Sequence, residues 1–261
     1  MGWVVGAAWT CACASLVFAG ARMARQGPKP SLAFASACVA GIAFVFALRL
    51  RPEFALAILP LDFFAPLEEA AAVPFALGVL AAALRPGLGR GRRAAFLILL
   101  VLVFAVGAWM AGRRLWPRDF PDLTTRIENG VCLQSREETC VAAALVTLLR
   151  ELGRPAEEAD MARLSFTVPG VGSSALRACR ALQVVFAGTG RSVTVVRPGP
   201  YGPFPTPCLM PISYGPMSEH MTVLLGLDGD GFLVGDPLAG RMRWTRDRFE
   251  RRWCGYLIAV R

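Results

Sequence analysis

The chain has 261 residues, 55% of them hydrophobic, and a formal net charge of +9. That hydrophobic share is too high for an ordinary soluble domain. The excess positive charge lies in the first half of the chain, which is also the more apolar one. Residues 1–118 carry 12 basic and 4 acidic side chains, against 16 and 15 in residues 119–261. Basic residues between long apolar runs are typical of membrane topology, so no nucleic-acid partner is expected.

Apolar segments in the first half predict about four transmembrane helices and hence a lipid bilayer as partner. They cover residues 2–20, 31–48, 66–84 and 94–112. A membrane-spanning helix needs about 20 apolar residues, with about 17 as the lower limit. Three of the segments reach this length without a charge, whereas the segment 66–84 includes Glu68 and Glu69 near its start. Residues 1–115 are therefore assigned to a multi-pass domain of the cell membrane.

The basic residues also predict how this domain is oriented. They follow the first apolar segment instead of preceding it, which argues against a cleaved signal peptide. The loops 21–30 and 85–93 together hold seven basic residues, and the opposite side holds five. The positive-inside rule then places these two loops in the cytoplasm and the second half of the chain on the extracytoplasmic side.

Residues 119–261 have the pattern of an α+β domain, with helices first and strands afterwards. Helices are predicted over 139–152, 156–164 and 173–183; Gly153 ends the first, and Ser173 or Ser174 caps the third. Apolar runs separated by Pro and Gly then predict strands. These are residues 192–197, 208–213, 220–226, 232–236, 241–244 and 256–260, with a short helix over 246–253 capped by Thr245.

The cysteine and histidine content narrows the chemistry of this domain. Eight Cys are scattered singly without a CxxC pair, and His220 is the only His in the chain. This argues against a zinc site and a disulfide-rich scaffold, and no cofactor is expected. Any Cys–His chemistry must use His220. Cys140 is its best partner because it opens a long amphipathic helix, where the helix N-terminus and an imidazolium both favour a thiolate.

Two further residues occupy positions suited to cysteine catalysis. Gln134 lies six residues before Cys140, so its side-chain amide can donate to an oxyanion together with the backbone N–H of Cys140. Asp236 lies sixteen residues after His220, at the far end of a predicted hairpin, where a carboxylate can orient the imidazole.

The hairpin makes this hypothesis depend on a strand register. A three-residue loop of Leu227, Asp228 and Gly229, with Gly229 left-handed, places Asp236 directly opposite His220. A two-residue turn of Asp228 and Gly229 places Asp236 opposite Met221 and on the other face. The catalytic hypothesis therefore requires the three-residue loop.

These motifs together resemble the double-glycine leader peptidases, papain-like cysteine peptidases that trim bacteriocin leader peptides. The resemblance covers about residues 131–260 and rests on four ordered motifs: Gln134-x5-Cys140, His220-Met-Thr-Val-Leu, Gly235-Asp236-Pro237 and Phe249-x3-Trp253-x-Gly255. It implies a papain-like domain over 119–261 that hydrolyses peptide bonds. By the resemblance, Cys140 is the nucleophile, His220 the general base and acid, Asp236 the orienting residue and Gln134 the oxyanion donor.

The chain also departs from the family pattern. Thr139-Cys140-Val141 replaces the usual Asp-Cys-Gly, and the best-known members carry the peptidase in front of an ABC exporter, whereas the apolar segments come first here. No GxxxxGK[ST] phosphate loop is present, so ATP-driven transport does not follow. Exporter-linked peptidase domains are cytosolic, which conflicts with the orientation that the charges predict.

The expected partners are a peptide or protein substrate and an export or processing machinery. Three other functions stay open at this point. The domain can be an inactive papain-like module that binds peptides for a membrane assembly, or an acyltransferase that uses the same thiol chemistry. The third alternative, a transport function, is supported only by the apolar segments.

Overall fold

The computed structural model describes residues 120, 122–199, 202–215 and 218–261, together with isolated positions at 53, 89–91, 94, 95, 98, 101, 102 and 105. The chain divides into two compact units, Met1–Arg51 with Pro66–Trp116 and Pro52–Ala65 with Pro117–Arg261. The predicted membrane segments 2–20, 31–48 and 66–84 lie outside the described residues, and 94–112 is described at six helical positions. None of the described helices has the length and hydrophobicity of a membrane crossing. The membrane domain and its bounds stay a prediction.

Three helices form one layer of the C-terminal domain: α7 (Cys140–Glu151), α8 (Glu158–Leu164) and α9 (Ala175–Val185). Helix α7 is almost entirely buried because its residues are small or aliphatic, and it ends before Gly153, which adopts a positive φ of 74°. Ser174 caps α9 by accepting a hydrogen bond from the backbone of Arg177. These helices confirm the predicted ones, except that α8 begins at Glu158 instead of residue 156 and that α9 begins and ends two residues later than the predicted 173–183.

A six-stranded antiparallel sheet forms the second layer. It contains β3 (Val193–Val196), β4 (Cys208–Gly215), β5 (Ser218–Asp228), β6 (Gly231–Asp236), β7 (Gly240–Trp244) and β8 (Leu257–Val260), in the order β3-β8-β4-β5-β6-β7. All six predicted strands are present within a few residues of their predicted ends. Helix α10 (Arg246–Arg252) follows β7 and is capped by Thr245, as predicted.

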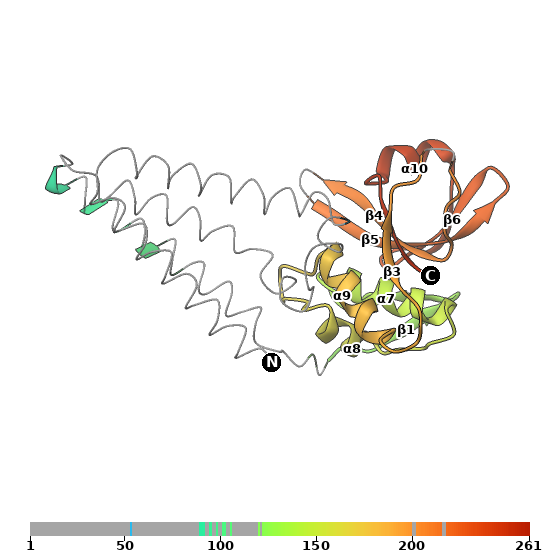
Figure 1. The fold of residues 1–261 in the computed structure, drawn as a ribbon, viewed down its shortest axis with the longest axis horizontal. Coiled ribbons are helices and arrows are strands. Elements are labelled where there is room, and N and C mark those ends of the chain that lie inside the picture. Colours follow the sequence, from blue (N-terminus) through green and yellow to red (C-terminus); the bar gives the residue numbers. More distant parts are fainter. Residues whose placement is uncertain are drawn as a thin grey trace. The chain divides into compact units, whose positions relative to one another are not determined.

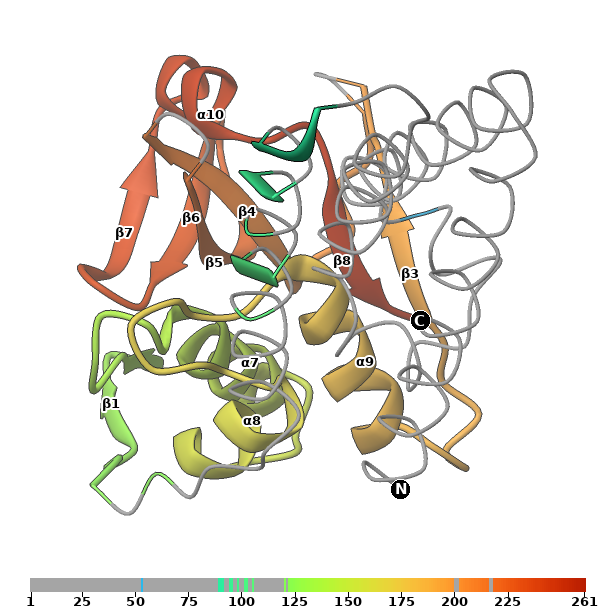
Figure 2. The same ribbon diagram turned by 90° about the vertical axis from the view of Figure 1, so that its left-hand side faces the viewer.

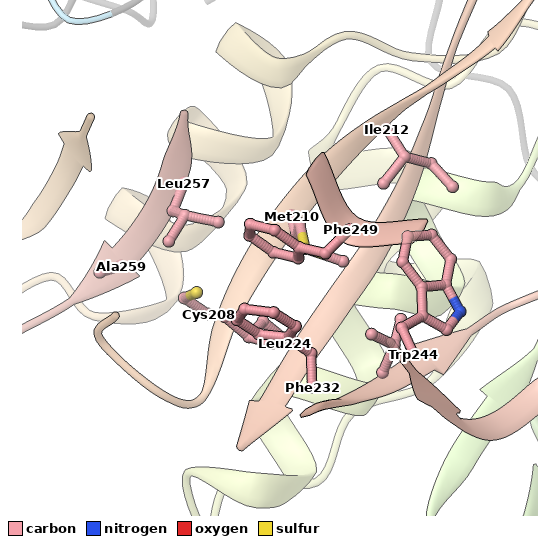
Figure 3. Close-up of a cluster of buried hydrophobic side chains, with 10 residues drawn as sticks. Cys208, Met210, Ile212, Leu224, Phe232, Trp244, Phe249, Leu257 and Ala259 are labelled. Atoms are coloured by element: carbon pink, nitrogen blue, oxygen red, sulfur yellow. The ribbon is translucent and has the colours of Figure 1, made fainter. Parts of the chain in front are cut away.

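The two faces of the sheet are covered by different helices. Helices α7, α8 and α9 lie together on one side (Figures 1 and 2), and α7 packs against β5 at the middle of the sheet. The other face carries an apolar cluster that α10 closes with Phe249, whose ring stacks on that of Phe232 at 3.9 Å between centroids (Figure 3). The sheet is therefore anchored on both faces, which holds its strand ends in a defined place.

A short hairpin precedes α7 that the sequence reasoning did not predict. Strands β1 (Arg126–Glu128) and β2 (Val131–Leu133) are joined by Asn129 and Gly130, which both have positive φ. Asn-Gly is the preferred pair for a two-residue hairpin turn of this kind, so the signal was present in the sequence. Strand β2 leads directly into Gln134, and its Cys132 backbone N–H donates to Thr147 Oγ1 of α7 at 2.9 Å.

The β5–β6 hairpin follows neither of the two predicted registers. Asp228 pairs with Gly231, so the turn consists of Gly229 and Asp230, and Gly229 is left-handed as expected (φ 60°). Further along, the register shifts because Leu225 is an extra residue in β5 that has no partner in β6. The prediction of a three-residue loop was wrong, because Leu227 and Asp228 belong to the strand and the turn has two residues. Neither predicted register allowed for the bulge at Leu225.

Candidate active site

Cys140 is the first residue of α7, and the loop in front of it is tightly hydrogen-bonded. Buried Thr139 donates from its backbone N–H and from its hydroxyl to the Arg136 carbonyl, at 3.1 and 2.9 Å. The backbone N–H of a first helical residue has no acceptor within the helix. The fold therefore presents a partly exposed thiol and an N–H donor at one point, at the positive end of the helix dipole.

His220 and Asp236 form a hydrogen bond of 2.8 Å between Nε2 and Oδ1. Leu224 pairs with Val234 and Val223 with Gly235, so one more step along the ladder places Asp236 beside Thr222. His220 then lies on the same face as Asp236 and diagonal to it, within reach of a side chain as long as histidine. The structure thus brings this predicted pair together by a different route from the predicted one.

The imidazole of His220 interacts with Cys140 as well as with Asp236. Burial alone would lower its pKa, but the hydrogen bond to Asp236, the hydrogen bonding and charge of Cys140, and the charge of Asp236 raise the pKa of His220 from 6.5 to about 9. Because Nε2 bonds the carboxylate, Nδ1 is the ring nitrogen available for proton exchange with Cys140. At neutral pH the ring is a proton donor beside the thiol.

The carboxylate of Asp236 is held ionised by its surroundings. Burial would raise its pKa, but the bond to His220, the backbone N–H of Leu238 at 2.9 Å, and the charges of His220 and Arg248 lower the pKa of Asp236 below its ordinary value. A carboxylate in this state favours an imidazolium and fixes the orientation of the ring.

Gln134 lies in the loop between β2 and Cys140, where its amide is turned toward its own backbone. Nε2 donates to the carbonyl oxygens of Arg136 and Glu137, at 2.8 and 3.1 Å. Its Oε1 atom is buried and has no hydrogen-bond partner among the described residues. In this arrangement the amide shapes the loop that leads into Cys140, and its role toward an oxyanion stays a prediction.

The other cysteines of the described region differ from Cys140 in their surroundings. Cys179 is buried within α9, and burial raises the pKa of Cys132 to about 12, of Cys254 to about 12, and that of Cys208 above its ordinary range. The thiols of Cys132, Cys208 and Cys254 therefore stay protonated at neutral pH. Of the five cysteines that the structure describes, Cys140 is the one whose side chain influences His220.

Two neighbours of the site were missed by the sequence reasoning. The exposed ring of Tyr214, at the end of β4, lies 5.5 Å from the imidazole of His220 between centroids. The Pro237 carbonyl accepts a hydrogen bond of 3.0 Å from the backbone of Gln134 and so ties the segment after Asp236 to the oxyanion-donor candidate. The contact of Gln134 with Pro237 has no local sequence signal because it joins segments far apart in the chain. Tyr214 and His220 lie in the adjacent strands β4 and β5, so their contact depends on the register of that hairpin.

An α+β domain that opens a buried helix with a cysteine, next to a His–Asp pair on a sheet, has the fold of a papain-like cysteine peptidase. The Peptidase C39 family model matches residues 128–261, about half of the chain. The chain belongs to this family of cysteine peptidases. The match includes all of Gln134, Cys140, His220 and Asp236.

Curated relatives are similar to about half of the chain. An uncharacterized protein from Methanothermobacter thermautotrophicus is 27% identical over 140 residues, which cover 50% of this chain and 87% of the relative. A second one, from Methanothermobacter marburgensis, is 29% identical over 129 residues, which cover 49% and 84%.

Solved structures with a similar domain are peptidase domains of transporters. The peptidase domain of Streptococcus ComA, a bi-functional ABC transporter involved in quorum sensing, is 22% identical, with a TM-score of 0.44 over 49% of this chain and 94% of that one. A double glycine motif protease from an AMS/PCAT transporter, in complex with its leader peptide, is 21% identical, with a TM-score of 0.42 over 53% and 94%.

Proposed function

We propose that this protein is a membrane-anchored cysteine peptidase that hydrolyses peptide bonds in leader peptides or membrane-proximal proteins. The observation that carries the proposal is the side-chain arrangement at the start of α7, where Cys140 interacts with an imidazole that is itself bonded to Asp236 at 2.8 Å. Membership of the Peptidase C39 family supports the reaction class.

The first half-reaction forms an acyl-enzyme. The Cys140 thiolate attacks the carbonyl carbon of the scissile peptide, forming a C–S bond and an oxyanion that the Cys140 N–H stabilises. The Gln134 amide is the second donor. To reach the oxyanion, Nε2 gives up the longer of its two hydrogen bonds, the one to the Glu137 carbonyl, and donates that hydrogen instead. The imidazolium of His220 gives its Nδ1 proton to the amine, the C–N bond breaks, and the amine product departs.

The second half-reaction returns the enzyme to its starting state. Neutral His220 takes a proton from water, and the resulting hydroxide attacks the thioester carbon. The C–S bond breaks, the new carboxylic acid leaves, and Cys140 is again a thiolate beside an imidazolium. Asp236 keeps the ring oriented through both steps, because its bond to Nε2 leaves Nδ1 facing the reacting atoms.

The setting of this chemistry follows from the first half of the chain. Its apolar segments support anchoring in the membrane, and the excess of seven over five basic residues supports an extracytoplasmic peptidase domain. The double glycine motif protease bound to a leader peptide supports a leader as substrate and an export machinery as partner. A reporter fused to the C-terminus would show on which side of the membrane the peptidase domain lies. We expect external protease to reach the reporter in intact cells, and a protected reporter would contradict the predicted orientation.

Loss of the thiol tests the proposed reaction. The full chain, purified in detergent, is incubated with peptides that carry a Gly-Gly junction, and products are identified by mass spectrometry. We expect wild-type protein to cleave them and Cys140→Ala to have no activity, whereas Cys254→Ala remains active because that thiol is protonated at neutral pH. Equal cleavage by Cys140→Ala and wild type would rule out the proposal.

A further inference from the structure

Glu158 is a buried carboxylate that the proposed reaction does not use. It is the first residue of α8, and its side chain is fully buried. A buried carboxylate costs free energy unless hydrogen bonds satisfy it, so its contacts indicate why it is there. Its Oε1 accepts from the backbone N–H of Ser135 at 3.0 Å, and its Oε2 lies 2.6 Å from the hydroxyl of the same residue.

Ser135 is the residue directly after Gln134, so this contact lies at the base of the oxyanion-donor loop. The amide of Gln134 bonds only Arg136 and Glu137, which belong to the same loop and move with it. Contacts of that kind shape the loop, and the bonds between Thr139 and Arg136 join it to the residue before Cys140, but neither holds Gln134 against the rest of the domain. Its position depends on bonds to other elements.

Several contacts hold the loop from outside. Ser135 bonds the Thr124 carbonyl at 2.9 Å and exposed Arg136 pairs with Asp122 at 3.1 Å, and two further contacts join the loop to the layers of the domain. On one side, the backbone N–H of Gln134 bonds the Pro237 carbonyl, next to Asp236. On the other side, Glu158 holds Ser135, and the backbone of Glu158 is bonded in turn to Thr125 Oγ1 at 2.8 Å. Pro237 follows β6 and Glu158 opens α8, so the loop is tied to both layers of the domain.

Building on the proposed function, we propose that Glu158 is a positioning residue that holds Gln134 in register with Cys140 through Ser135. Without the carboxylate, the backbone N–H of Ser135 loses its acceptor and its hydroxyl is left with the Thr124 carbonyl, at 2.9 Å. The loop is then held at Pro237 and by the weaker outer contacts of Ser135 with Thr124 and of exposed Arg136 with Asp122. A donor that moves away from the oxyanion loses most of its effect, because electrostatic stabilisation of the transition state depends on a preorganised distance.

Two reactions of the same thiol separate this role from a general structural one. Acylation of Cys140 by p-nitrophenyl acetate passes through an oxyanion: the S–C bond forms, the C–O bond breaks, and p-nitrophenolate leaves. Alkylation by iodoacetamide displaces iodide at a saturated carbon and forms no oxyanion. Both rates are measured on the full chain in detergent, after subtraction of the rate of Cys140→Ala, and neither requires the natural substrate.

We expect Glu158→Gln to lower the acylation rate about tenfold or more and to leave alkylation near the wild-type rate. Glu157→Gln, the same change at the exposed neighbour, should alter neither rate. In a Gln134→Ala background, Glu158→Gln should have no further effect on acylation, because both changes act through one donor.

An unchanged acylation rate in Glu158→Gln would overturn the inference, and so would an equal fall of both rates or full additivity with Gln134→Ala. If Glu158→Gln does not fold, Ser135→Ala tests the same contact, with a smaller fall in acylation alone as the expected result. A wild-type Cys140 that reacts with neither reagent would overturn the proposed function itself, and this inference with it.

Discussion

His220 and Asp236 are hydrogen-bonded at 2.8 Å although they are diagonal and not directly opposite in the β5–β6 ladder. The two-residue turn by itself would put their side chains on opposite faces of the sheet. Leu225 is an additional residue in β5, and its bulge restores the alternation that puts both side chains on one face. The contact between the base and its carboxylate therefore depends on the strand register that holds beyond the bulge.

The raised pKa of His220 predicts how activity and stability depend on pH. The imidazolium that protonates the leaving amine is present below the folded pKa of about 9, so kcat/KM should fall as pH rises through about 9. The same imidazolium stabilises the folded domain. This contribution is complete below the pKa of His220 in the unfolded chain, 6.5, and is lost as pH rises to its folded pKa of about 9. A pH profile of peptide cleavage, with melting temperatures over the same range, measures both. Asp236→Asn removes a negative charge that raises the pKa of His220, so the fall in kcat/KM should begin at a lower pH. An unshifted profile would contradict the pairing of His220 with Asp236.

Removal of the carboxylate should reduce the reaction more than its replacement by an amide. In Asp236→Ala the ring loses the carboxylate that bonds Nε2, and its described side-chain hydrogen bonding is left to Cys140 alone. We expect kcat/KM to fall about 10²-fold through misorientation. Asp236→Asn keeps an oxygen that accepts from Nε2–H and should lose less. Steady-state cleavage of a peptide substrate distinguishes the two variants, and equal losses would mean that the charge matters more than the orientation.

Deletion of Leu225 tests the role of the bulge. The deletion leaves Leu224 opposite Val234 and keeps His220 on the face of Asp236, so a folded variant should retain cleavage at a reduced stability. Deletion of Val223, two residues away, shifts Asp236 opposite Met221 and should abolish cleavage. Circular dichroism shows whether each variant is folded. Loss of activity in a folded Leu225 deletion would mean that the distorted backbone, and not the strand pairing, sets the contact.

The apolar cluster behind the sheet should account for much of the stability of the domain. Phe249 is fully buried against Phe232, so Phe249→Ala should lower the free energy of unfolding by about 3–5 kcal/mol. Arg251→Ala, on the same helix but exposed, should change it by no more than about 0.5 kcal/mol. Denaturant unfolding followed by intrinsic fluorescence measures both. A loss below about 1 kcal/mol for Phe249→Ala would show that α10 does not stabilise the sheet.

Local signals explain which elements of the domain could be predicted. Helix α7 was predicted by its unbroken small and aliphatic residues before Gly153, and α10 by the capping position of Thr245. Hairpin β1–β2 was missed because its strands are three residues long, although Asn129-Gly130 carries the turn signal. The start of α8 was placed too early because Pro155 fits a first helical position, whereas the helix begins at Glu158.

The residue pattern predicted the members of the candidate site and their order along the chain, because a single His and one helix-opening Cys leave few combinations. It also placed Asp236 correctly as the partner of His220, but by the wrong register. Three features follow from the three-dimensional packing instead: the way that pair meets, the direction of the Gln134 amide, and the bond from Glu158 to the residue after Gln134. Bulges and long-range hydrogen bonds depend on which elements pack together. The periodicity of residues within one strand or helix does not predict this packing.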